Sequence, residues 1–183
     1  MRILIDMDGV LADFDGGLFT ATADFIEWPE EALARTRRFC TDYLGKREAK
    51  AVRAFIEKTD FFRDLPVIPG ARLVVEDLLE RGHDLWVCSK PLEANPWCAN
   101  SKMAWIEEHF PELSGKVILA PNKGMIAGDV LLDDAIKERD IAGASWVPVH
   151  YTYPHNADRH GHRFTWADGA TALEEVANYQ WDW

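Results

Sequence analysis

Short apolar runs that alternate with amphipathic stretches give this chain the pattern of a parallel sheet flanked by helices. The first run, at residues 2–5, contains three consecutive apolar residues, which indicates a strand buried on both faces. Further strands are expected at residues 83–88, 116–120, 130–132 and 145–150. The pattern therefore predicts an α/β fold built on a central parallel sheet.

Two helical blocks lie between the first and second expected strands. One opens at Pro29 and closes with the basic segment 35–38, so its charges match the helix dipole. The other spans about residues 46–58 and carries apolar residues on one face. A further helix starts at Pro69, stops at Gly82 and returns the chain to the sheet.

This order divides the chain into two expected parts. Residues 16–66 form a small inserted helical cap, and residues 1–15 and 67–183 form the core. A polar tail at residues 151–163 precedes a last helix near residues 170–179. Three histidines in the tail are open to two interpretations, a metal site or a solvated loop: His155, His160 and His162.

Composition and charge exclude several classes of function. Hydrophobic residues make up 48% and charged residues 28% of the 183 residues, as in ordinary globular proteins. The formal net charge of −11 argues against binding nucleic-acid polymers, which favour basic surfaces. The three cysteines lack the spacing of a disulfide framework or a zinc site. No signal peptide is evident and no apolar run approaches the roughly 18 residues of a membrane span, so we expect a cytoplasmic protein without membrane contact.

The strongest chemical signal is an acidic pair directly after the first expected strand. Asp6 and Asp8 are two positions apart, and Gly9 permits the sharp turn that brings both acids to one side. Spacing alone would also fit a solvated turn. Because loops at the carboxyl ends of parallel strands form ligand sites, the position favours a catalytic pair.

A second acidic pair, Asp133 and Asp134, follows the apolar run at residues 130–132. Parallel topology would place it beside the first pair, where four carboxylates raise one another's pKa unless a cation lies among them. Oxygen ligands of this kind suit a hard divalent ion. The sequence therefore predicts a Mg²⁺ site between the two pairs.

A hydroxyl and an ammonium group follow two further expected strands. Ser89 comes directly after residues 83–88, and Lys123 lies shortly after residues 116–120. Taken singly, the serine would be a turn cap and the lysine a surface residue. Their order along the chain, between the two acidic pairs, instead favours phosphate binding.

The order Asp-x-Asp-Gly, Ser, Lys and Asp-Asp, each after an apolar strand, resembles the haloacid-dehalogenase superfamily of phosphotransferases. The resemblance covers the whole chain and implies a Rossmann-like core with an inserted cap. Within that superfamily, several segments look like the 5′(3′)-deoxyribonucleotidase family: residues 6–14, 61–62, 69–71, 102–105, 131–134, 155–156 and 166–168.

The resemblance implies a two-step phosphatase mechanism. Asp6 would attack phosphorus and form an aspartyl-phosphate. Asp8 would protonate the leaving nucleoside oxygen and later deprotonate water, which requires that neighbouring acids raise its pKa. Mg²⁺ would be held by the Asp6 carboxylate, the Asp8 backbone carbonyl and either Asp133 or Asp134. The nonbridging phosphate oxygens would be bound by Ser89, Lys102 and Lys123.

The substrate class that the family suggests is a small phosphomonoester, specifically a deoxynucleoside monophosphate. The base and sugar would pack under the cap against Phe14, Phe39 and Phe62, while Phe61 fits cap core equally well. The second motif departs from the family, because Lys90 stands where Thr-Ser-Pro has its serine, and we place Lys90 in the substrate pocket. Further departures near the nucleoside are Cys40, where an aromatic residue is expected, and Ala135, where the family often has arginine.

These departures leave base preference and deoxy preference open. A phosphatase of another small phosphoester, such as a sugar phosphate, is an alternative, and a nucleotide-binding protein without catalysis is a second. Phosphate release from matched substrate panels would distinguish them. A homodimer is also left open.

Overall fold

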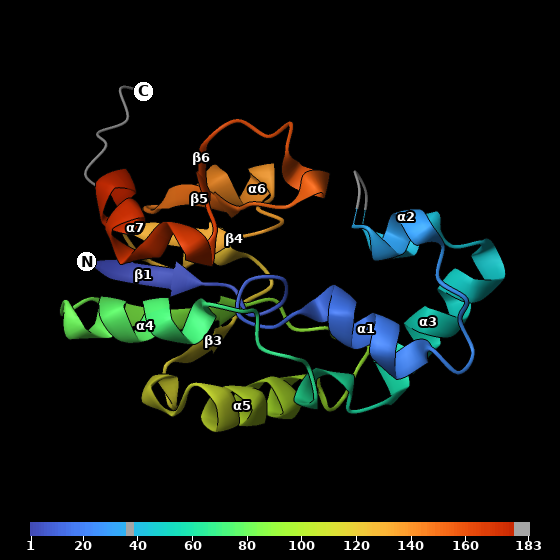
Figure 1. Cartoon of the computed structure of the whole chain (residues 1–183). Helices are drawn as coiled ribbons and strands as arrows, with labels where there is room; N and C mark the ends of the chain where they lie inside the picture. The colour runs from blue at the N-terminus through green and yellow to red at the C-terminus, as the bar shows by residue number, and fades with distance from the viewer. Residues whose placement is uncertain (36–38, 178–183) are drawn as a thin grey trace.

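The computed structural model describes residues 1–35 and 39–177, which contain one parallel six-stranded sheet (Figure 1). The strand order is β3-β2-β1-β4-β5-β6. The strands are β1 (Arg2–Ile5), β2 (Asp84–Ser89), β3 (Val117–Leu119), β4 (Val130–Asp133), β5 (Val147–Tyr151) and β6 (His162–Phe164). The predicted α/β class with a central parallel sheet is confirmed, and the five expected strands lie within two residues of their predicted bounds.

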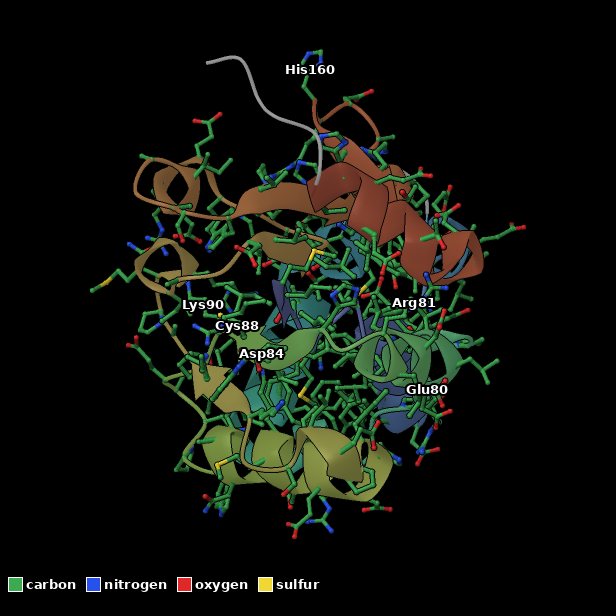
Figure 2. All side chains as sticks on the ribbon, turned by 90° about the vertical axis from the view of Figure 1, so that its left-hand side faces the viewer. Glu80, Arg81, Asp84, Cys88, Lys90 and His160 are labelled. Carbon is green, nitrogen blue, oxygen red and sulfur yellow. The ribbon has the colours of Figure 1, made fainter. Side chains whose placement is uncertain are left out.

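The strand β6 corrects the expectation of an irregular polar tail. It pairs with β5, so that Tyr151 lies opposite Phe164. Its sequence, His162-Arg163-Phe164, contains one apolar residue and so gives no strand pattern, and the pairing becomes visible only in the folded chain. His162 consequently lies half-buried in a strand, whereas His160 projects from the loop before it, as the solvated-loop interpretation requires (Figure 2).

The central strand β1 is buried on both faces, as its three apolar residues predict. Ile3 and Ile5 belong to the main hydrophobic cluster, while Leu4 points to a smaller cluster on the other face. Helices of the core are α4 (Ala71–Glu80), α5 (Cys98–His109), α6 (Glu138–Ile141) and α7 (Gly169–Ala177). The helices α4 and α7 pack against each other beside the sheet. The expected end of α7 near residue 179 lies outside the described residues.

Helices between β1 and α4 lie beyond the carboxyl end of β1, away from the rest of the sheet (Figure 1). They are α1 (Phe14–Thr22), α2 (Glu30–Leu33) and α3 (Lys46–Lys58). The bounds of α3 match the prediction. The helix α2 is shorter than expected, because the chain leaves the helical conformation at Arg35, whose φ is +47°; the remainder of the basic segment, residues 36–38, lies outside the described residues.

The helix α1, which contains two adjacent glycines, has no periodic apolar pattern and was not predicted. The structure supplies two reasons for the helix. Asp13 caps its first turn by accepting a hydrogen bond from the Gly16 amide at 3.0 Å. Gly17 is required by packing, since a Cβ there would lie 2.5 Å from Leu65 Cδ2. A residue with low helix propensity therefore lies where the helix packs closely against the Leu65 side chain.

Specific hydrogen bonds attach the helical segment to the sheet. The Asn95 side chain, which follows β2, donates to the carbonyls of Ile56 and Thr59 at 2.6 and 2.9 Å. Trp105 Nε1 on α5 donates to the Leu65 carbonyl at 2.6 Å. Short 3₁₀ turns complete the connections: Cys40–Tyr43, Phe61–Arg63, Pro111–Leu113, Lys123–Met125, Pro154–Asn156 and Trp166–Asp168. None of the described helices combines the length and apolar character needed to cross a bilayer.

Candidate active site

Three carboxylates gather at the carboxyl end of the two central strands. Asp6 follows β1, Asp133 ends β4, and Asp134 comes next in the chain. One carboxylate oxygen from each lies within 4.8 Å of the others. Register fixes this arrangement, because Ile5 pairs with Leu132 and the Asp6 amide donates to the Leu132 carbonyl at 2.9 Å. The topology therefore brings together the two acidic pairs that the sequence predicted to be neighbours.

The turn after Asp6 depends on Gly9. Its φ is +74°, a conformation that residues with a Cβ rarely adopt. A Cβ at this position would also lie 3.0 Å from the Asp134 carboxylate. Gly9 thus lets the loop after β1 approach the loop after β4.

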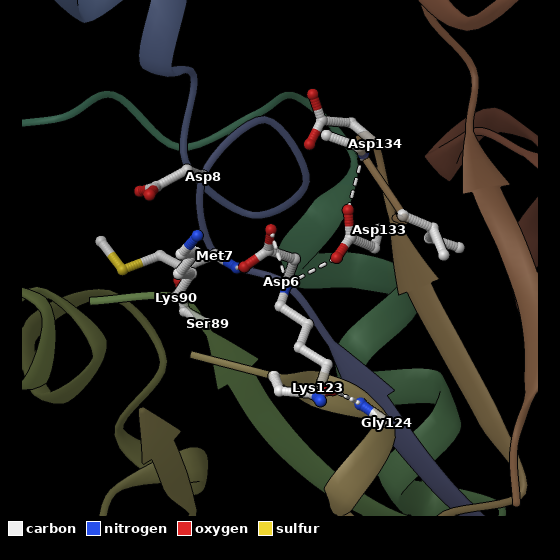
Figure 3. Close-up of polar contacts among 12 residues, drawn as sticks. Asp6, Met7, Asp8, Ser89, Lys90, Lys123, Gly124, Asp133 and Asp134 are labelled. Atoms are coloured by element: carbon white, nitrogen blue, oxygen red, sulfur yellow. Dashed lines mark hydrogen bonds and ion pairs between the residues drawn. The ribbon is translucent and has the colours of Figure 1, made fainter. Parts of the chain in front are cut away.

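Lys123 links the two strands through their carboxylates. Its Nζ lies 2.9 Å from Asp6 Oδ2 and 2.6 Å from Asp133 Oδ2 (Figure 3). Burial alone would lower the pKa of Lys123, but the two carboxylates together raise it above its usual value. The lysine is therefore a fixed positive charge that orients Asp6.

Asp8 lies on the other side of Asp6 from Asp133 in the view of Figure 3. Its Oδ2 accepts a hydrogen bond from Lys102 Nζ at 2.6 Å, and the same ammonium group donates to Ser89 Oγ at 2.9 Å and to the Lys90 carbonyl at 3.0 Å. Asp8 Oδ1 is buried without a hydrogen-bond partner among the described residues. One oxygen of Asp8 is thus anchored and the other is unsatisfied.

Burial is the main cause that raises the pKa of Asp8, and Lys102 opposes it. The negative charge of Asp6 adds a smaller increase. This corrects the expectation that neighbouring acids would be the leading cause. In the metal-free protein burial also raises the pKa of Asp6, while Lys123 opposes the shift.

Asp134 is held by residues from the segment after β5. His155 Nε2 lies 3.3 Å from Asp134 Oδ2, and Asn156 Nδ2 donates to the Asp134 carbonyl at 2.8 Å. Burial raises the pKa of Asp134 to about 7, with the hydrogen bond from His155 acting in the opposite direction. His155 is therefore part of the site, and the solvated-loop interpretation is wrong for this histidine.

An aromatic stack extends from His155 toward the helical segment. The His155 ring stacks on Phe39 at 4.4 Å between centroids and on Tyr153 at 5.3 Å. Phe39 is 45% exposed, so much of its surface is open to a ligand. The stack forms an aromatic wall, and His155, the ring common to both contacts, also touches Asp134 of the acidic cluster.

A cavity of about 320 Å³ joins the acidic cluster to this wall, a volume in the range of small-molecule sites. It is lined by Asp6, Asp8, Gly9, Phe14, Asp15, Phe39, Cys40, Thr41, Lys90, Ala120, Pro121, Lys123, Asp133, Asp134, Ala135, Lys137, Asp140, Tyr153 and His155. A second cavity, of about 640 Å³, shares Asp8, Phe14, Thr41 and Lys90 with the first and extends to Phe62. The two form one cleft between the helical segment and the sheet.

Most residues that the sequence proposed for the site line this cleft. Ser89 and Lys102 instead lie buried behind Asp8, which they hold through one hydrogen-bonded chain. Sequence reasoning missed Tyr153, His155 as a site residue, and Lys137. Of these, only His155 had a signal, since the segment His155-Asn156 resembles the related family.

The donor set fits a hard divalent cation. Asp6, Asp133 and Asp134 offer oxygen ligands only, and burial, with a smaller contribution from the neighbouring carboxylates, raises the pKa of Asp6 and of Asp134. Asp8 contributes no side-chain oxygen to this cluster, because its carboxylate is directed to Lys102. A buried carboxylate held by lysine, a neighbouring acid and a cation site together can support phosphoryl transfer.

Comparisons with known proteins agree with this chemistry. The family model for the 5′ nucleotidase, deoxy (pyrimidine), cytosolic type C protein matches residues 1–177. The mouse mitochondrial 5′(3′)-deoxyribonucleotidase is 35% identical over 168 residues, covering 85% of this chain and 74% of that protein. The human cytosolic 5′(3′)-deoxyribonucleotidase is 34% identical over 164 residues, covering 85% and 82%.

Among solved structures, a haloacid dehalogenase family hydrolase from Deinococcus radiodurans with bound phosphate and sodium has a TM-score of 0.59. It shares 16% sequence identity and covers 96% of this chain and 95% of its own. At this identity the likeness establishes a common fold.

Proposed function

Because the chain belongs to the family of the cytosolic type C deoxy (pyrimidine) 5′ nucleotidases, which are phosphoric monoester hydrolases, we propose that it hydrolyses deoxynucleoside monophosphates to nucleoside and phosphate. One observation carries this proposal. Asp6, oriented by Lys123, lines a cavity that is also lined by the stack of Phe39, His155 and Tyr153. The cavity thus offers a nucleophile for phosphorus and an apolar surface for a base.

The first step transfers the phosphoryl group to Asp6. A carboxylate oxygen of Asp6 forms a bond to phosphorus while the bond from phosphorus to the ester oxygen breaks. Asp8 gives its proton to that oxygen, so the nucleoside leaves as an alcohol. The raised pKa of Asp8 supports this role, because burial favours the protonated form of this acid.

The second step returns the enzyme to its starting state. Asp8, now ionised and anchored by Lys102, accepts a proton from water as the water oxygen attacks phosphorus. The bond from phosphorus to Asp6 breaks and the carboxylate is released with inorganic phosphate as the product. Lys123 stabilises the Asp6 carboxylate in both steps.

Mg²⁺ fits the acidic cluster as the cofactor. The Asp6 carboxylate and Asp133 or Asp134 would hold it, with the Asp8 backbone carbonyl as a further ligand. When bound, the ion would neutralise charge on the phosphoryl group. The whole chain carries a net charge of −11, which repels an anionic substrate. A local positive charge at the site is therefore necessary.

Residues 16–66 act as a cap over the base in this proposal. Phe14 and Phe39 line the cavity, and Phe62 lines its extension, so the three aromatic residues expected at the nucleoside surround one cleft. Phe61 packs edge-on against Phe14 at 5.2 Å and is buried, as a cap-core residue would be. A cytoplasmic location is supported by the cytosolic human relative, although mitochondrial relatives also match.

Phosphate release tests the proposal. Purified protein is incubated with Mg²⁺ and matched panels of deoxyribonucleotides, ribonucleotides and sugar phosphates, and each reaction is repeated with EDTA. We expect metal-dependent release with a preference for deoxynucleotides. Preferential turnover of sugar phosphates would change the assigned substrate class to sugar phosphates. Absence of phosphate release from every nucleotide would refute the proposed nucleotidase activity.

A further inference from the structure

Two lysines of the cavity wall are close to each other and lack acidic partners. Both lysines line the same cavity, and the nearby Lys90 side chain is the leading cause that lowers the pKa of Lys137. Within residues 1–35 and 39–177, neither ammonium group is within ion-pair distance of a carboxylate. Both side chains are exposed, and both line the cavity that contains Asp6. Two positive charges that lie close together at a cavity wall repel each other, and an anion that binds between them reduces this repulsion.

The pair approaches Asp6 from both neighbouring strands. Lys90 follows Ser89 at the end of β2, and Figure 3 shows it on the Asp8 side of Asp6. Lys137 comes four residues after the end of β4, on the opposite side of β1 in the strand order. The backbone of Lys90 is fixed because its carbonyl accepts a hydrogen bond from Lys102 at 3.0 Å. The two lysines therefore flank the strand end that carries the nucleophile.

The other lysines of the site are already engaged. Lys123 is paired with Asp6 and Asp133, and Lys102 with Asp8. The remaining ionisable groups lining the cavity near the pair are acidic, including the buried Asp140, which belongs to the helix that follows Lys137. Among the described residues that line this acidic cavity, only Lys90 and Lys137 carry an ammonium group that is not paired with a carboxylate. A phosphate group that enters the cavity can therefore pair with these two lysines.

We propose that Lys90 and Lys137 form a clamp that binds the phosphate dianion of the substrate and positions it against Asp6. This inference rests on the proposed phosphatase function and names two residues of its binding site. Both lysines contact nonbridging oxygens of the phosphoryl group, and both also retain the inorganic phosphate product. The nucleoside is bound elsewhere, at the aromatic wall.

Binding of inorganic phosphate tests the clamp directly. Isothermal titration calorimetry in the presence of Mg²⁺ compares wild-type protein with the double variant Lys90→Gln, Lys137→Gln. A matched control is Lys46→Gln, Lys50→Gln, which removes two exposed charges one turn apart on α3, outside both cavities. A second variant, Lys90→Arg with Lys137→Arg, retains the charges. Circular dichroism checks that each variant is folded.

We expect the double glutamine variant to bind phosphate about tenfold or more weakly, as loss of charged hydrogen bonds requires, while the control and the arginine variant bind as the wild type does. Unchanged phosphate affinity in the glutamine variant would overturn the clamp. So would weaker nucleotide binding with unchanged phosphate affinity, since the lysines would then contact another part of the substrate.

The same measurement separates this inference from the proposed function. If phosphate binding depends on the two lysines but no nucleotide is hydrolysed, the clamp stands and the nucleotidase proposal fails. If deoxynucleotides are hydrolysed while phosphate affinity is insensitive to both lysines, only the clamp is refuted.

Discussion

Burial shapes the chemistry of individual acids at this site. Asp6, Asp8 and Asp134 each have a pKa raised chiefly by desolvation, and each has a cationic or imidazole partner that opposes the increase. The partners are different residues from different elements: Lys123 and His155 lie in two short 3₁₀ turns, and Lys102 lies in α5. Each carboxylate therefore has its own environment, which suits the different roles of a nucleophile, an acid and a metal ligand.

Removing the nucleophile tests the role of Asp6. Replacement with asparagine preserves side-chain shape and eliminates the attacking oxygen, so we expect turnover to fall by at least about a thousandfold. The unfolding midpoint of the metal-free protein should not decrease, because a buried charge is removed. Steady-state phosphate release and urea unfolding provide the two measurements. Asp158→Asn, at an exposed position, is the control, and near-normal turnover by the Asp6 variant would contradict the covalent mechanism.

The raised pKa of Asp134 predicts how stability changes with pH. A carboxyl group whose folded pKa is about 7 contributes stability below its usual pKa near 4, and this contribution is lost as the pH rises through 7. In EDTA, Asp134→Asn should therefore be more stable than the wild type at pH 8, by about 1 to 4 kcal/mol. The difference should shrink toward pH 5. Urea unfolding at both pH values measures it, and a pH-independent difference would contradict the expectation.

Single residues could be assigned from the sequence where they follow strands in a motif. Asp6, Asp8, Asp133 and Asp134 belong to this group, since strand order alone places them at one edge. Tyr153, His155 and Lys137 could not be assigned in this way, because their contacts arise from loops whose paths depend on packing. Lys102 was assigned to the phosphate, yet in the described structure its ammonium group holds Asp8. Only the folded chain reveals that arrangement.

At the scale of elements, periodic signals predicted the helices and strands that carry long apolar patterns. The helix α3 and the strands β1 to β5 are of this kind. The helix α1 and the strand β6 are not, since glycines interrupt the first and the second contains only one apolar residue. Both are stabilised by contacts distant in sequence: Gly17 packs on Leu65, and β6 pairs with β5. Local propensity is overridden there by tertiary structure.

The aromatic wall joins the helical segment to the core through Phe39 and His155. Replacing Phe39 with alanine removes the stacking surface for a base, so we expect KM for a deoxynucleotide to rise about tenfold. Hydrolysis of glycerol phosphate, which has no ring, should be unchanged. Phe25→Ala is a matched control, because Phe25 has a similar exposure of 50% and lies in the same helical segment outside the active-site cavity. Equal effects on both substrates would show that Phe39 acts on the fold instead of the base.

For the whole molecule, excess negative charge makes a cation part of the expected working state. Binding of Mg²⁺ to the folded protein alone raises stability with concentration, by about 2.7 kcal/mol at a hundredfold excess over Kd. We expect a corresponding rise in Tm that EDTA reverses and that Asp133→Asn abolishes. Thermal unfolding in NaCl of matched ionic strength is the control. An equal rise in NaCl would indicate general screening of the net charge of −11 and no specific site.

The central claim, that a deoxynucleotide passes its phosphoryl group to Asp6, is tested most directly by trapping that intermediate. Asp8→Asn removes the group that activates water, so the aspartyl-phosphate should form and then hydrolyse slowly. The variant is mixed with a deoxynucleotide labelled in its phosphate, quenched in acid, and digested for mass spectrometry. We expect the label on the peptide that contains Asp6, and none when Asp6→Asn is added to the same chain. Rapid phosphate release by the Asp8 variant with no labelled protein would contradict both the intermediate and the assigned acid and base.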